Sequence, residues 1–190
     1  MKDTLNAVTK QIDALLVQKE TVTIAIDGKC TSGKTTLASM LAQRYDCNVF
    51  HMDDFFLRPE QRTLERLSEI GGNTDYVRFQ EEVLTPLQSG SSFSYRPYDC
   101  KTQTLSKPVC IYPKALNIIE GSYALHPYFG SPYDLKVLLT VSPETQRQRI
   151  MQRNPFLHKR FFEEWIPMEN RFFETLPFQS DLEAGYLVIS

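Results

Sequence analysis

The sequence predicts an α/β fold, with a parallel β-sheet of about five strands flanked by helices. Helical and strand-like segments alternate over the first fifty residues, and three more short apolar segments follow later in the chain. Strands that alternate with helices pair in parallel, because each helix carries the chain back to the same end of the sheet. A chain of 190 residues is about the length of one domain and can bury a core without a disulfide or metal. We therefore expect a single domain over residues 1–190.

The first fifty residues carry the clearest periodicity. Leu5, Val8, Ile12 and Leu15 recur at steps of three and four, which is typical of an amphipathic helix. The β-branched segment T-V-T-I-A-I that follows it is typical of a buried strand. The predicted elements in this part are a helix over 4–18, a strand over 21–26, a helix over 34–44 and a strand over 47–52.

The rest of the chain is less regular, although three apolar segments again indicate strands. Ser142, Pro143 and Glu144 supply a cap and a first-turn proline for a helix that runs to about Arg153. The predicted elements are a helix over 75–87, a hairpin or long loop over 90–113, and strands over 115–119, 135–141 and 186–189.

Composition and charge exclude several classes of function. The 21 Lys and Arg against 23 Asp and Glu give a net charge of −2, so no overall positive field attracts nucleic acid or an anionic membrane. No apolar run approaches the ~18 residues of a membrane span, and the first residues are charged, unlike a secretory signal. The four cysteines form no C-x-x-C pair. We expect free thiols and a cytoplasmic protein that binds neither nucleic acid nor membrane.

A glycine-rich loop lies between the first predicted strand and the second predicted helix. Its residues 28–35 read G-K-C-T-S-G-K-T and match G-x-x-x-x-G-K-[ST], the signature of the P-loop NTPase fold. Such a loop wraps a phosphate with inward N–H groups, and the helix N-terminus adds a favourable potential. We expect Lys34 to reach the β- and γ-phosphates and Thr35 to offer its hydroxyl to Mg²⁺. The predicted nucleotide contacts are Gly28, Lys29, Cys30, Thr31, Ser32, Gly33, Lys34, Thr35 and Thr36. A glycine-rich turn that merely begins a helix is the alternative.

Other segments narrow the class of P-loop protein. The chain has no N-K-x-D segment for reading guanine and no L-S-G-G-Q signature of transporter ATPases. It is also too short for an oligomeric ATPase module with a helical lid domain. A small-molecule kinase remains, which needs a nucleotide cradle, an acceptor pocket with a base, and a basic lid.

Two acidic residues follow predicted strands at the edge where ligands of open α/β sheets bind. Asp53, after the second strand, is the candidate base: its carboxylate can accept the hydrogen bond of an acceptor hydroxyl and align the hydroxyl oxygen with the γ-phosphorus. Glu120 closes the third strand, where P-loop proteins place the acid that orients Mg²⁺. A solvated turn at Asp53 and a solvated strand end at Glu120 are the alternatives. His51 is expected to be a strand residue without a catalytic role.

A basic segment supplies the candidate lid, over about 147–165. Between Glu144 and Arg160 it carries five basic residues and one acid. Arg149 and Arg153 lie four residues apart, on one face of a helix, and are the predicted catalytic arginines. Guanidinium groups that close over the phosphoryl group would stabilise its charge and exclude water. A solvated helix with scattered arginines is the alternative.

Six segments follow one another between residues 20 and 160: Gly28 to Thr35, Met52-Asp53-Asp54-Phe55-Phe56, Asn73-Thr74-Asp75, Pro97-Tyr98-Asp99, Ile119-Glu120-Gly121 and the arginine helix. Their order resembles that of uridine kinase-like P-loop kinases. The resemblance implies that Asp53 is the base, that Phe56, Asp75 and Tyr98 contact a nucleoside, and that ATP (or GTP) and Mg²⁺ are used. It places the acceptor-binding region at about 53–100.

The chain also departs from the family pattern. Phe56 lacks the hydroxyl of the family's tyrosine, Asp54 replaces a serine, and Pro97 directly precedes Tyr98. Arg153-Asn154-Pro155-Phe156 replaces an Arg-Gly-Arg-like ending of the lid. The aromatic segments 161–166 and 171–173 are expected to pack in the core or lid and not to stack a base.

The sequence thus predicts an ATP- and Mg²⁺-dependent kinase that acts on a hydroxyl of a small molecule. The 5′-hydroxyl of uridine or cytidine is the first acceptor to consider. Another nucleoside, a sugar or a pantothenate-like alcohol is the alternative among kinases. A nucleotide-binding regulatory module is the alternative from another class, although a regulator needs no carboxylate beside the γ-phosphate. The oligomeric state stays open.

Overall fold

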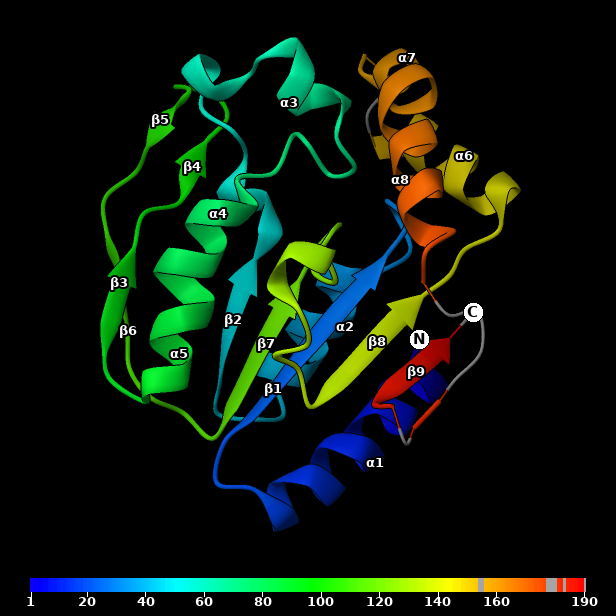
Figure 1. Ribbon diagram of the computed structural model, residues 1–190. Helices are drawn as coiled ribbons and strands as arrows, with labels where there is room; N and C mark the ends of the chain where they lie inside the picture. The colour runs from blue at the N-terminus through cyan, green and yellow to red at the C-terminus, as the bar shows by residue number, and fades with distance from the viewer. Residues whose placement is uncertain (154–155, 177–180, 183, 190) are drawn as a thin grey trace.

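The computed structural model describes residues 1–153, 156–176, 181–182 and 184–189, and it confirms the predicted α/β architecture (Figure 1). Its five-stranded sheet has the order β2-β7-β1-β8-β9, and every pair is parallel. The strands are β1 (Val22–Gly28), β2 (Cys47–His51), β7 (Leu116–Glu120), β8 (Leu135–Leu139) and β9 (Tyr186–Ile189). Parts of the predicted domain and lid, at 154–155, 177–180, 183 and 190, lie outside the described residues. They include Asn154 and Pro155 of the lid ending.

The sheet brings the carboxyl ends of three strands together. Glu120, the last residue of β7, pairs with Ile26 of β1 on one side and with His51 of β2 on the other. The apolar, β-branched strands β7 and β8 are buried along their whole length. Side chains that follow β1, β2 and β7 therefore lie at one edge of the sheet.

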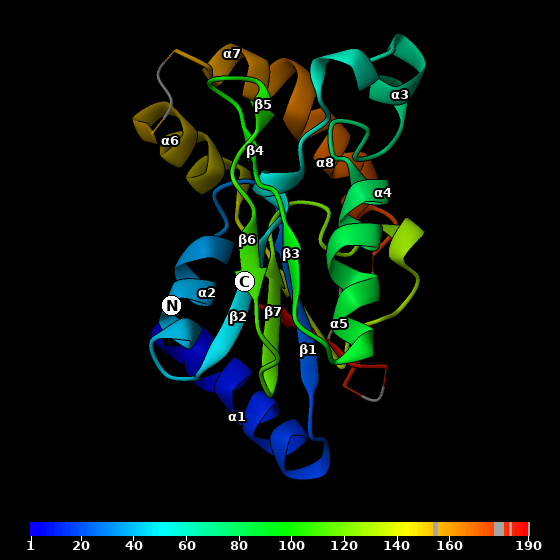
Figure 2. The same cartoon turned by 90° about the vertical axis from the view of Figure 1, so that its left-hand side faces the viewer.

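Helices cover both faces of the sheet, as Figure 2 shows. Helices α1 (Lys2–Gln18) and α2 (Lys34–Ala42) lie on one face, where Val8, Ile12, Leu37 and Leu41 pack in one apolar cluster. The opposite face carries a helical run over residues 76–89 and the C-terminal helix α8 (Ile166–Phe173). The run consists of α4 (Tyr76–Phe79), a π-helical turn η3 (Gln80–Leu84) and α5 (Thr85–Ser89).

The predicted hairpin is present as two short antiparallel ladders within one excursion of the chain. Strand β3 (Phe93–Tyr95) pairs with β6 (Val109–Ile111), and β4 (Tyr98–Asp99) pairs with β5 (Thr104–Leu105). All four cysteines have free thiols, as predicted. Among the described residues, no helix has both the length and the apolar composition that a bilayer crossing requires.

Several short helices beyond the carboxyl ends of the strands were not predicted. Helices α3 (Leu64–Ser68), α7 (His158–Arg160) and α8 lie over this end of the sheet (Figure 1). The others are 3₁₀ or π turns: η1 (Met52–Phe55), η2 (Pro59–Gln61), η4 (Pro127–Phe129) and η5 (Phe161–Trp165). Helix α6 (Pro143–Arg153) has its predicted bounds, whereas β8 ends two residues before the predicted Val141.

Candidate active site

The loop after β1 has the conformation of a phosphate cradle. Gly28 has a φ of +151°, and a Cβ atom there would overlap the carbonyl oxygen of Leu139, so glycine is required. The Nζ of Lys34 donates to the carbonyl oxygens of Gly28 at 2.5 Å and Lys29 at 3.1 Å. The buried ammonium group is thus held inside the curve of the loop. The predicted nucleotide contacts, residues 28–36, lie on this loop and on the first turn of α2.

Oxygen atoms suited to a magnesium ion lie at the ends of α2 and β7. The Thr35 hydroxyl donates to Oε1 and Oε2 of Glu120, each at 3.2 Å. The Nδ1 of His51 lies 2.6 Å from Glu120 Oε1, and this hydrogen bond raises the pKa of His51. Hydroxyl and carboxylate oxygens are the ligands that Mg²⁺ prefers, so Thr35 and Glu120 fit the ion. His51 fixes the orientation of Glu120, which the sequence analysis did not anticipate.

Asp53 and Asp54 face different surroundings although they are adjacent in η1. Asp54 accepts a hydrogen bond from the Tyr95 hydroxyl at 3.1 Å. Asp53 lines a cavity that also contains Lys34 and Glu120. Burial by the surrounding protein and the charge of Glu120 raise the pKa of Asp53, and the charge of Lys34 opposes this shift. A carboxylate with a raised pKa, opposite a phosphate cradle, is suited to accept a proton.

The cavity has a volume of about 280 Å³, and several of the predicted site residues line it. Arg153, at the end of α6, also lines it. Among the residues that line it, Cys30, Thr31, Lys34, Thr35, Asp53, Phe56, Glu120 and Arg153 were predicted from the sequence.

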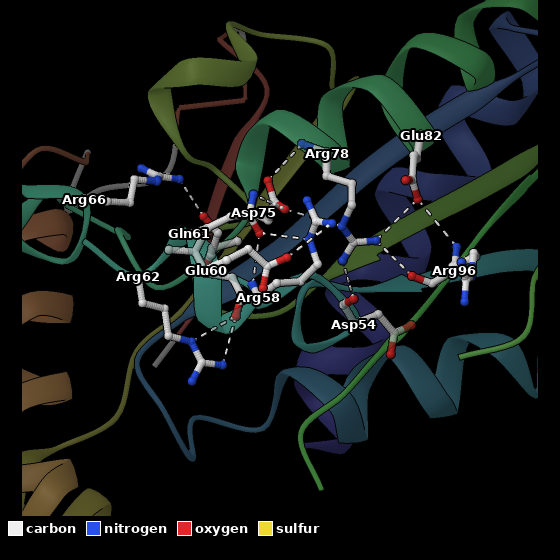
Figure 3. Close-up of polar contacts among 12 residues, drawn as sticks. Asp54, Arg58, Glu60, Gln61, Arg62, Arg66, Asp75, Arg78, Glu82 and Arg96 are labelled. Atoms are coloured by element: carbon white, nitrogen blue, oxygen red, sulfur yellow. Dashed lines mark hydrogen bonds and ion pairs between the residues drawn. The ribbon is translucent and has the colours of Figure 1, made fainter. Parts of the chain in front are cut away.

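The structure places two predicted acceptor contacts away from this cavity. Asp75 is buried, caps α4 by accepting from the N–H of Arg78 at 3.2 Å, and also accepts from the side chain of Gln61 (Figure 3). The hydroxyl of Tyr98 accepts from Arg62 at 2.8 Å. Neither residue is among the described residues that line the cavity.

The predicted lid arginine Arg149 and the aromatic residues of segments 161–166 and 171–173 lie at different places in the structure. Arg149 donates to the carbonyl oxygen of Thr31 at 2.7 Å and lines a second cavity, which Ser32 of the loop also lines. Phe161 and Trp165, which were expected to pack in the core or lid, line the main cavity as an edge-to-face pair with centroids 4.5 Å apart. Phe172 and Phe173 pack in the core as expected.

Sequence reasoning missed several polar residues of the site, among them Asn73, Ser122 and Glu169. Asn73 and Ser122 line the cavity from loops, next to the motif residues Asp75 and Glu120. Glu169 of α8 also lines it and is buried. No motif marked Glu169, which lies 139 positions from the loop residue that it contacts.

These features define a P-loop NTPase fold, with the glycine-rich loop and Asp53 and Glu120 lining one cavity at the carboxyl ends of the strands. No family model matches the sequence, and no curated protein matches it. Similar solved structures include a possible uridine kinase from Bacillus stearothermophilus, with 23% identity, a TM-score of 0.62 and coverage of 89% of this chain and 93% of that one.

Two further solved structures have the same fold. A proposed fructose transport system kinase from Silicibacter sp. TM1040 has 21% identity, a TM-score of 0.74 and coverage of 98% of both chains. D-glycerate 3-kinase from Cryptococcus neoformans has 12% identity, a TM-score of 0.61 and coverage of 88% of this chain and 86% of that one. At these identities the likeness shows the fold.

Proposed function

We propose that the protein is a kinase that transfers the γ-phosphoryl group of ATP to a hydroxyl of a small molecule. One observation carries the proposal: Asp53, a carboxylate with a raised pKa, shares a cavity with Lys34 of the phosphate loop. A site that only binds or hydrolyses nucleotide has no need of a base placed to receive an alcohol. The solved structures of similar fold described as kinases support this class.

In the proposed reaction the acceptor oxygen forms a bond to the γ-phosphorus while the bond from that phosphorus to the β–γ bridging oxygen breaks, so ADP leaves. Asp53 accepts the proton of the acceptor hydroxyl. Lys34 and Arg153 stabilise the charge of the phosphoryl oxygens. Thr35 and Glu120 would hold Mg²⁺, which supplies charge neutralisation at the phosphates.

The acceptor that we propose first is the 5′-hydroxyl of uridine or cytidine. The family resemblance and the aromatic surfaces of Phe56, Phe161 and Trp165, on which a planar base can stack, support it. The engaged side chains of Asp75 and Tyr98 favour instead a smaller alcohol such as a sugar, which is the alternative. GTP is the alternative donor, and the free thiols agree with a cytoplasmic location.

The test is a panel of nucleosides, sugars and pantothenate-like alcohols incubated with MgATP, with phosphorylated product detected by mass spectrometry. We expect one acceptor class to give product that Lys34→Ala abolishes. ATP hydrolysis without phosphorylation of any alcohol would instead favour a regulatory module.

A further inference from the structure

A carboxylate of helix α8 is hydrogen-bonded to the phosphate loop. Glu169, in the middle of α8, accepts the backbone N–H of Cys30 at Oε2, over 2.9 Å. Its Oε1 accepts the hydroxyl of Ser122, two residues after Glu120, over 3.0 Å. This one side chain therefore ties α8 both to the phosphate loop and to the segment that follows β7.

The carboxylate of Glu169 is buried and has no positively charged hydrogen-bond donor within the described part of the chain. The residue is 4% exposed, its two hydrogen-bond donors are uncharged, and no ion pair found among the described residues includes it. Burial is the main cause of the raised pKa of the Cys30 thiol, about 12, and the charge of Glu169 adds to this shift. The same charge also adds to the raised pKa of Asp27. A buried anion with neutral partners is not explained by stability alone.

The position of this anion conflicts with that of a transferred phosphoryl group. Glu169, Lys34 and Asp53 line the same cavity, and a phosphoryl group passing from nucleotide to acceptor must lie between Lys34 and Asp53. Phosphate oxygens bind the N–H groups of such loops, and Glu169 already occupies the N–H of Cys30. A terminal phosphate would bring further negative charge beside this carboxylate.

We propose that Glu169 is a specificity-determining residue of the donor site, which opposes the terminal phosphate of a nucleoside triphosphate until its carboxylate leaves the Cys30 N–H. Because Glu169 belongs to α8, entry of a triphosphate then breaks the hydrogen bond between this helix and the phosphate loop, and a diphosphate lets the bond form again. The inference rests on the proposed function, since it requires that the loop binds a nucleotide.

The experiment compares two nucleotides on three proteins by calorimetry in the presence of Mg²⁺. The ligands are a non-hydrolysable ATP analogue and ADP, and the proteins are the wild type, Glu169→Gln and Glu174→Gln. Glutamine keeps an oxygen for the Cys30 N–H and removes the charge. We expect Glu169→Gln to bind the analogue roughly tenfold more tightly, with ADP affinity changed by less than about twofold. Glu174, exposed at the end of the same helix, is the matched control and should change neither affinity.

A second variant and the single tryptophan separate a charge effect from a structural one. Glu169→Ala should also bind the analogue more tightly, because the effect comes from the charge. In the wild type, the analogue but not ADP should change the emission of Trp165, which is one turn before Glu169 and lines the same cavity.

Three results would overturn the inference: equal changes for analogue and ADP, weaker binding of the analogue by both variants, or a Trp165 response that ADP reproduces. If the wild type binds the nucleotides but shows one of these results, only the inference fails. If neither nucleotide binds any of the three proteins, the proposed function fails and the inference with it.

Discussion

At the scale of single residues, two adjacent aspartates illustrate how surroundings decide chemistry. Asp53 and Asp54 both follow β2, and burial raises the pKa of each. The Tyr95 hydroxyl donates to Asp54, whereas Asp53 shares a cavity with the loop lysine. The difference lies in which side of η1 each carboxylate extends from. We therefore expect the two residues to respond differently to the same substitution.

The first prediction concerns Asp53→Asn. Turnover should fall by ~10²-fold or more, the usual scale of acid–base contributions, because the amide cannot accept the proton of the acceptor. Affinity for the ATP analogue should change little. Steady-state kinetics and calorimetry measure the two quantities.

Asp54→Asn is the matched control and should keep most of the turnover. The pH dependence gives a second check: the base must be deprotonated, so wild-type turnover should fall as the pH drops through the raised pKa of Asp53. Unchanged turnover in Asp53→Asn would remove this residue from the mechanism.

The second prediction concerns His51, which orients Glu120 through a 2.6 Å contact. His51→Ala should raise the Mg²⁺ concentration needed for half-maximal activity by roughly tenfold, the lower end of the effects seen when a ligand loses its supporting hydrogen bond. Turnover at saturating Mg²⁺ should change much less. A magnesium titration of activity measures this shift, and an unaltered titration curve would contradict the positioning role.

At the scale of elements, the sequence predicted the strands, helices and loop that have local sequence patterns. The apolar strands at 116–120 and 135–139 and the helix over 143–153 were found within a few residues of their true bounds, since periodicity and capping are local signals. The loop at 28–35 was equally clear. The contact of Glu169 with Cys30 was not predictable, because it depends on how α8 packs after the sheet has formed.

Motif matching assigned a role to Asp75 without considering its neighbours in the chain. The segment Asn73-Thr74-Asp75 was expected to present Asp75 to the acceptor. Arg78 lies three residues later, and its N–H is capped by Asp75 while its guanidinium forms an ion pair with the same carboxylate. A capping interaction of this kind is visible in the sequence, and it accounts for the inward position of Asp75.

The third prediction concerns the anchoring of α8. Phe172 is 1% exposed and packs edge-to-face on Tyr123, whose ring centroid lies 5.1 Å away and which itself lines the cavity. Phe172→Ala should lower the free energy of unfolding by about 3–5 kcal/mol, because the core is left with a cavity. Denaturant unfolding measures the change. Leu64→Ala, at a residue that is 90% exposed, is the control and should cost less than about 0.5 kcal/mol.

At the scale of the whole molecule, Asp27 joins the sheet to the segment that follows β7. Its carboxylate is fully buried and accepts the N–H groups of Gly28 at 2.7 Å and Leu125 at 2.9 Å. Burial raises its pKa from 3.8 to about 7, although Lys34 and these two hydrogen bonds oppose the shift. The acid that precedes the phosphate loop therefore changes charge near neutral pH.

This shift predicts how the stability of the fold depends on pH. Between pH 3.8 and about 7 the folded protein keeps a proton that the unfolded chain has released, so Asp27 lowers the free energy of unfolding as the pH rises through this window. The loss should reach a few kcal/mol, since one pKa unit corresponds to about 1.4 kcal/mol. Urea unfolding at pH 5 and pH 8 measures it against Asp27→Asn, which cannot titrate. The free energy of unfolding of the wild type, minus that of Asp27→Asn, should be smaller at pH 8 than at pH 5. A difference between the two proteins that stays constant across this range would mean that the carboxyl of Asp27 does not titrate there.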